Sequence, residues 1–117
     1  MDKLFDSLLN EQLSSIEFVQ DYLQLHFDGN SLTYYVWPTV TVNSKSYCIT
    51  EEGYRDAICK LIAQELKEVS FIENRALNLY FSNGDHVSLS LARDASNTEV
   101  IEFVYFRGLN SDWFVLD

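Results

Sequence analysis

Alternation of apolar and polar residues, interrupted by short glycine turns, constrains this chain more than any other feature of its sequence. Residues 22–27 place leucine or phenylalanine at every second position, as a half-buried strand does. Asp28-Gly29 follows and suits a type I′ hairpin turn, because both central residues of that turn need positive φ. We therefore expect 32–37 to return as the partner strand and to end before Pro38, which has no amide hydrogen for a ladder.

Further short β-prone segments predict a larger antiparallel sheet. Strands are expected at 15–19, 69–74, 76–81, 86–91, 100–106 and 113–116, with a loop or edge hairpin over 39–49. At the start of the chain, Leu4, Phe5, Leu8 and Leu9 share one face of a short helix over 2–9, which Asp2 would cap.

One segment carries the spacing of a long amphipathic helix. Thr50 is a good N-cap, and Glu51 and Glu52 would complement the helix dipole in the first turn. From Glu51 to about Lys67 the apolar residues form one stripe, made of Tyr54, Ile58, Leu61, Ile62 and Leu66. The 117 residues thus predict one α+β domain: a mainly antiparallel, curved β-sheet or half-barrel packed on one long helix, with a short N-terminal helix.

Two hairpins resemble each other at a distance of about 54 residues. Residues 23–27, a glycine turn and Leu32-Thr33 correspond to 77–81, a glycine turn and Val87-Ser88. A short strand precedes each hairpin. The pattern is explained either by a duplicated three-stranded meander or by the ordinary likeness of half-buried hairpins.

Charge limits the classes of partner. Eighteen Asp and Glu face eight Lys and Arg, which gives a formal net charge of −10. Such a chain repels nucleic acid and anionic membrane, and its field attracts basic proteins. Excess acid that only keeps a small protein soluble is the alternative account.

No pattern in the chain predicts catalysis, a cofactor or a metal. His26 and His86 are too few for a metal site, which needs three or four ligands. Cys48 and Cys59 lack zinc or redox spacing, and no signature supports Cys48 with His26 as a nucleophile pair. The chain also shows no secretory signal and no apolar run that could span a membrane, so we expect a cytoplasmic protein that is not an enzyme.

The aromatic residues indicate a binding surface. The segments 32–37 and 100–106 are apolar on both sides, and one helix cannot cover both faces of a large sheet. Rings left exposed beside acids would form a protein-binding hot spot, or else they fill a second core or a homodimer seam. The residues predicted to bind a partner are Tyr35, Trp37, Tyr80, Glu17, Asp21 and Glu102, with Glu51, Glu52 and Asp56 as the second choice.

Together these features resemble the immunity proteins of bacterial toxin–immunity systems, including contact-dependent growth inhibition. Those families are small, cytoplasmic, often acidic, α+β or β-rich, and free of catalytic motifs. The segment 22–29, with Leu32-Thr33 and Trp37-Pro38, is also similar to a hairpin of small bacterial proteins without known function. The resemblance implies an inhibitor that binds a cognate toxin, expected to be a basic nuclease domain, and occludes its active site. The alternative is a homodimeric structural or adaptor module without catalytic activity.

Overall fold

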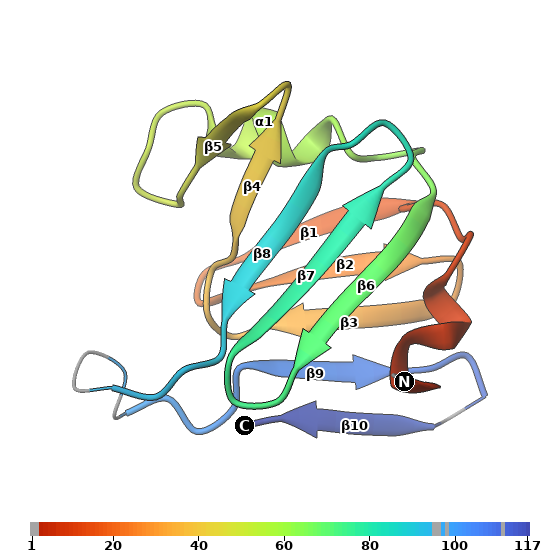
Figure 1. Cartoon of the computed structure of the whole chain (residues 1–117), viewed down its shortest axis with the longest axis vertical. Coiled ribbons are helices and arrows are strands. Elements are labelled where there is room, and N and C mark those ends of the chain that lie inside the picture. The colour runs from red at the N-terminus through yellow and green to blue at the C-terminus, as the bar shows by residue number, and fades with distance from the viewer. Residues whose placement is uncertain (1–2, 95–96, 98, 111) are drawn as a thin grey trace.

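The computed structural model describes residues 3–94, 97, 99–110 and 112–117. Two five-stranded antiparallel sheets lie face to face, with their strands crossing (Figure 1). The first sheet contains, in spatial order, β1 (Ser15–Val19), β2 (Tyr22–Phe27), β3 (Asn30–Tyr34), β9 (Val104–Arg107) and β10 (Trp113–Leu116). The second sheet contains β5 (Lys45–Tyr47), β4 (Thr39–Val42), β8 (His86–Ser90), β7 (Ala76–Phe81) and β6 (Leu66–Ile72). A 3₁₀ helix, η1 (Lys3–Leu8), and one short α-helix, α1 (Tyr54–Cys59), complete the described elements.

The core lies between the two sheets and follows the alternation of the strands. In β2 and β7 every second residue is buried, and the residues between them are partly exposed. Phe27 and Phe81 stack across the core with ring centroids 6.4 Å apart. Full burial of each such leucine or phenylalanine stabilises the fold by about 1.5–3 kcal/mol. The alternation thus fixes which side of each sheet faces its partner.

The long helix predicted from Glu51 to about Lys67 is wrong. The α-helix covers only Tyr54–Cys59, and its N-cap is Gly53 with φ 92° rather than Thr50, whose Oγ1 lies 3.3 Å from Cys48 Sγ. Ala63 then takes a left-handed conformation with φ 77°, and the chain becomes strand β6 at Leu66. Leu61 and Leu66 are still fully buried. The apolar stripe therefore marked core residues correctly, but a helix and a strand share them.

The fold class predicted for the chain is also wrong, because the sheet does not pack on a helix. A second sheet covers the inner face of the first, and the fold is mostly antiparallel β. Several strand limits differ as well: β3 ends at Tyr34, β9 begins only at Val104 and β6 begins early, at Leu66. The edge hairpin expected within 39–49 is confirmed as β4 and β5. The expected type I′ geometry is confirmed too, with φ 48° at Asp28 and 96° at Gly29. The predicted helix cap Asp2 lies outside the described residues.

The two halves of the chain repeat the same order of elements. A short helix, a three-stranded meander and a hairpin form η1 with β1–β5, and the same series forms α1 with β6–β10. Each hairpin leaves its own meander and pairs with the other one: β4 lies beside β8, and β9 lies beside β3 (Figure 1). The halves have therefore exchanged their hairpins.

Equivalent hydrogen bonds join the two halves at their starts. Leu13 N donates to Gln64 O at 3.0 Å, and Leu66 N donates to Glu11 O at 2.9 Å. Asn10 N donates to Leu66 O and Ala63 N donates to Leu13 O, both at 2.7 Å. Asn10, like Ala63, has positive φ, at 69°. Each bond becomes its counterpart when the halves are interchanged, so an approximate twofold axis relates them.

A matching pair of buried polar side chains holds the exchanged hairpins. Asn30, at the start of β3, accepts a hydrogen bond on Oδ1 from Leu109 N at 2.9 Å, in the turn after β9. Asp85, just before β8, accepts one on Oδ1 from Asn43 N at 3.1 Å, in the turn after β4. Both side chains are buried. Each half thus binds the turn of the hairpin that the other half supplies.

Candidate protein-binding site

Four aromatic rings cross the outer face of the first sheet, from β2 to β10. Tyr22 lies 6.0 Å from Tyr35, and Tyr105 lies 6.5 Å from Trp113, measured between ring centroids. Tyr35 is 41% exposed and Trp113 is 65% exposed. We call these four residues the aromatic strip. Strand alternation aims them outward, because Leu23, Tyr34 and Phe106 beside them fill the core.

An acidic cleft opens at one end of the aromatic strip. It has a volume of about 630 Å³ and is lined by Asp21, Tyr35, Glu99, Val100, Ile101 and Glu102. Three carboxylates thus surround apolar surface, and Ile101 is 83% exposed. Exposed apolar groups rimmed by charge are typical of protein interaction sites.

Arg93 holds the segment that forms the far wall of the acidic cleft. Its guanidinium donates hydrogen bonds to the carbonyl oxygens of Val100 and Ile101 and to that of Asp117. It also lies over the ring of Phe103, 4.7 Å from the centroid. One planar side chain therefore ties the linker between the sheets to the C-terminal strand.

The electrostatics of the cleft act on Tyr35. Partial burial raises the pKa of its hydroxyl, and the negative charge of Glu102 raises it further, with smaller effects from Tyr105 and Tyr22. The phenol is neutral at physiological pH, as an unperturbed tyrosine is, and can donate a hydrogen bond.

The structure brings together some of the predicted binding residues. Asp21, Tyr35 and Glu102 all line the acidic cleft. Glu17 lies on the same outer face, on edge strand β1, with Oε1 3.4 Å from Nε2 of His26. Asp21 and Glu102 thus adjoin the aromatic strip at Tyr35, and Glu17 lies on the same face of the sheet.

The other predicted residues lie elsewhere. Trp37 is partly buried against the core, in the crossing from β3 to β4. Tyr80 lies on the outer face of the second sheet, 5.4 Å from the ring of His86. Within 100–106, which the sequence showed to be apolar on both sides, Val104 and Phe106 are buried because the second sheet covers them.

The second-choice acids lie around α1. Glu51 accepts a hydrogen bond from Cys48 N at 2.8 Å, and this bond lowers the pKa of its carboxyl. Glu52 is exposed just before the helix. Asp56 lines a separate groove that also contains Lys45 and Lys60. The acidic field is therefore weaker here than at the acidic cleft, whose described lining residues include no cation.

Tyr105, Trp113, Glu99 and Ile101 belong to the site but were not among the predicted residues. Alternation along 113–116 places Trp113 and Phe114 on opposite faces of the sheet, so a core position for Phe114 predicts that the indole of Trp113 faces outward. For Glu99 and Ile101 no signal was available, because their positions depend on the hydrogen bonds from Arg93 rather than on a strand.

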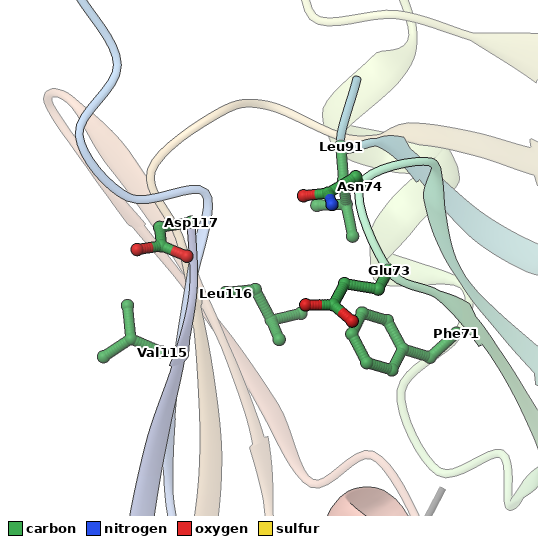
Figure 2. A pocket seen from close by; sticks show the side chains of 7 residues that line it. All are labelled: Phe71, Glu73, Asn74, Leu91, Val115, Leu116 and Asp117. Atoms are coloured by element: carbon green, nitrogen blue, oxygen red, sulfur yellow. The ribbon is translucent and has the colours of Figure 1, made fainter. Parts of the chain in front are cut away.

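A second, smaller cavity lies between the β6–β7 turn and the C-terminal strand (Figure 2). It measures about 80 Å³, well below the roughly 300–1,000 Å³ of ordinary small-molecule sites. Phe71 and Leu116 point into it, with the carboxylate of Glu73 between them (Figure 2). The cavity therefore has room for a few waters rather than for a cofactor.

Within the described part of the chain, both cysteines are free and exposed. No group of three or more His, Cys, Asp or Glu residues there is placed to hold a metal ion. Burial raises the pKa of the Cys59 thiol, and Asp56 adds to the effect, so less of the reactive thiolate forms. Among the described helices, none has the length and apolar character needed to cross a bilayer.

Comparison of the chain with protein-family models, with curated proteins and with solved structures gives no match.

Proposed function

We propose that this chain is an acidic immunity-type protein, which binds a cognate basic protein toxin and blocks it by occluding the active site. A nuclease domain is the expected target, because its substrate cleft must be cationic to hold a phosphate backbone. One observation carries the proposal: the acidic cleft, in which three carboxylates surround exposed apolar surface and an exposed tyrosine.

Charge and apolar surface would serve different steps of binding. A net charge of −10 speeds the encounter with a basic partner, toward ~10⁸ M⁻¹s⁻¹ at low salt. Rings and aliphatic side chains that become buried on docking then slow dissociation. An inhibitor of this kind needs no catalytic group of its own.

The direct test is co-expression with the protein encoded by the neighbouring upstream reading frame. We expect a stable complex, and loss of the partner's nuclease activity when the complex forms. The charge-removing variant Asp21→Asn with Glu99→Gln and Glu102→Gln should weaken binding at least about tenfold and reduce its salt dependence.

The matched control removes the same charge elsewhere. Glu51→Gln with Glu52→Gln and Asp56→Asn neutralises three carboxylates around α1, and the glutamine amide oxygen at position 51 can still accept the hydrogen bond from Cys48 N. This variant should bind nearly as well as the unmodified chain. Equal losses of affinity in the two variants would mean that only total charge matters. Failure of the chain to form a complex with any basic partner would refute the proposal.

A further inference from the structure

We infer that the aromatic strip is the surface on which the partner docks, and that the partner lays arginine or lysine side chains over its rings. This rests on the proposed function, and it deepens it by naming the face and the chemistry of the contact. The acidic cleft at the end of the strip would receive one of these cations.

The repeat within the chain provides an internal comparison for this face. Strand pairing defines which residues occupy equivalent positions in the two sheets. On the inner faces both halves are apolar: Leu25, Leu32, Phe106 and Phe114 correspond to Leu79, Val87, Val40 and Tyr47. The core pattern is thus shared between the halves.

On the outer faces the halves differ sharply. By the same strand pairing, Tyr22, Tyr35, Tyr105 and Trp113 correspond to Ala76, Ser90, Thr39 and Ser46. A sheet with the same connections therefore forms without any of the four rings. Since none of the four rings packs against the core, and Tyr35 and Trp113 are exposed, a role in binding explains them better than a role in folding.

The strip has suitable dimensions for a protein contact. It crosses β2, β3, β9 and β10, which at about 4.8 Å between neighbouring strands spans roughly 14 Å. Tyrosine and tryptophan are the residues most enriched at the centres of protein interfaces. At each end of the strip, two neighbouring rings lie close enough together to form one continuous platform.

Charge at the cleft end of the strip selects a cationic occupant, whereas Arg107, the strand partner of Trp113 on the same face, already places a cation at the other end. Asp21, Glu99 and Glu102 line the cleft beside Tyr35, and Glu17 lies further along the same face. Guanidinium and ammonium groups bind the faces of tyrosine and tryptophan and are attracted by these carboxylates. A second copy of this chain would bring like charges together, and a nucleic acid would bring phosphates to them.

The test uses the full chain, labelled with ¹⁵N, and a short oligo-arginine peptide as the probe, with oligo-glutamate as the negative control. We expect amide shifts to concentrate on β2, β3, β9, β10 and the cleft, with oligo-lysine binding more weakly on the same residues. Shifts concentrated around Glu51 to Asp56 or on the second sheet, or no binding, would overturn the inference.

Variants taken from the other repeat separate ring contacts from charge. Tyr22→Ala, Tyr35→Ser, Tyr105→Thr and Trp113→Ser, made together, place at each position the residue found at its equivalent and change no charge. We expect affinity for the peptide to fall at least about tenfold. If the combined variant does not fold, Tyr35→Ser and Trp113→Ser made separately should each lower it about threefold or more. The control Tyr80→Ser removes a ring from the second sheet and should leave affinity unchanged.

Unchanged affinity in the variants lacking the strip rings would overturn the inference even if the parent chain binds. A dimer in light scattering that dissociates in those same variants would also overturn it, since a second copy would then occupy the strip. The peptide experiment does not involve the toxin. If the co-expression test fails but the peptide binds the strip as expected, the proposed inhibitor function is refuted and the inference that the strip binds cationic side chains still stands.

Discussion

Asn30 offers a sharp test of how the exchanged hairpins are held. Its Oδ1 accepts the hydrogen bond from Leu109 N at 2.9 Å, and the side chain is only 7% exposed. Asn30→Ala removes the acceptor and leaves the Leu109 amide without its partner. The cost of such a loss is about 1–2 kcal/mol of unfolding free energy, which in a domain of this size lowers Tm by roughly 4–8 °C.

Urea unfolding followed by tryptophan fluorescence measures this loss directly. The midpoint should fall while the slope with denaturant stays constant, because the surface exposed on unfolding is unchanged. Asn30→Asp is the matched control, since the equivalent position in the other half is Asp85, whose carboxylate accepts the corresponding bond from Asn43 N. It should lose less than half as much stability as Asn30→Ala.

Two results would refute the reasoning about Asn30. An unchanged midpoint in Asn30→Ala would show that the bond to the hairpin turn contributes nothing measurable. Equal destabilisation by alanine and aspartate would show that the amide nitrogen of Asn30, which donates to Phe27 O at 3.4 Å, matters more than the acceptor.

Three further predictions concern buried or bridging side chains. The hydroxyl of Tyr34 is buried without a hydrogen-bond partner among the described residues, so Tyr34→Phe should leave stability unchanged or raise it by up to about 1 kcal/mol in urea unfolding; a loss above that range would reveal a missed partner. Arg93→Ala should cost about 1–2 kcal/mol and make 99–103 sensitive to limited proteolysis, and Arg93→Lys should not restore it, since lysine cannot reach several carbonyls in one plane. Burial raises the pKa of Tyr34 and of Tyr54 above the ordinary value near 10. Because the pKa of each hydroxyl is higher in the folded than in the unfolded state, the contribution of the two protonated hydroxyls to the free energy of unfolding is complete below about pH 10. It declines as the pH rises above that value, by up to about 1.4 kcal/mol per pH unit for Tyr34. Unfolding followed by phenolate absorbance would show this, and a flat stability profile above pH 10 would contradict it.

Local patterns in the sequence predicted most of the strands but not how they are covered. Residues 22–27 and 76–81 alternate so regularly that only a half-buried strand fits them, and both strands have the predicted limits. The β4–β5 hairpin was also predictable from its turn residues. Period and turn chemistry are local properties, which is why they can be read from a single chain.

The helix over 51–67 failed because a distant partner overrides local propensity. Residues 63–66 pair with 10–13 instead of continuing a helical turn. The turn between the helix and β6 also carries no usual signal, since Ala63 takes the left-handed conformation that glycine or asparagine ordinarily takes. The spacing of Ile58, Leu61 and Leu66 fits both a helix and the observed helix-to-strand change.

Only part of the site could be predicted from the sequence, because its acids and rings come from different kinds of structure. Asp21, Tyr35 and Glu102 were expected together, and the two-sheet fold places them at one cleft. Tyr80 was expected with them, but its strand β7 belongs to the meander of the second half, which forms the opposite sheet. Which sheet a hairpin joins depends on long-range pairing, and no local pattern records it.

The hairpin exchange also has a kinetic consequence. Thr33 pairs with Tyr105, and Val40 pairs with Val87, so neither sheet can be completed until distant parts of the chain have met. Folding rates fall as the mean sequence separation of contacting residues rises, and β-rich folds of this kind require milliseconds to seconds. The first half cannot finish its own sheet until β9 and β10, which follow the whole second meander in the sequence, have been synthesised. The nascent chain must therefore wait, with the edge of β3 unpaired, until β9 has left the ribosome.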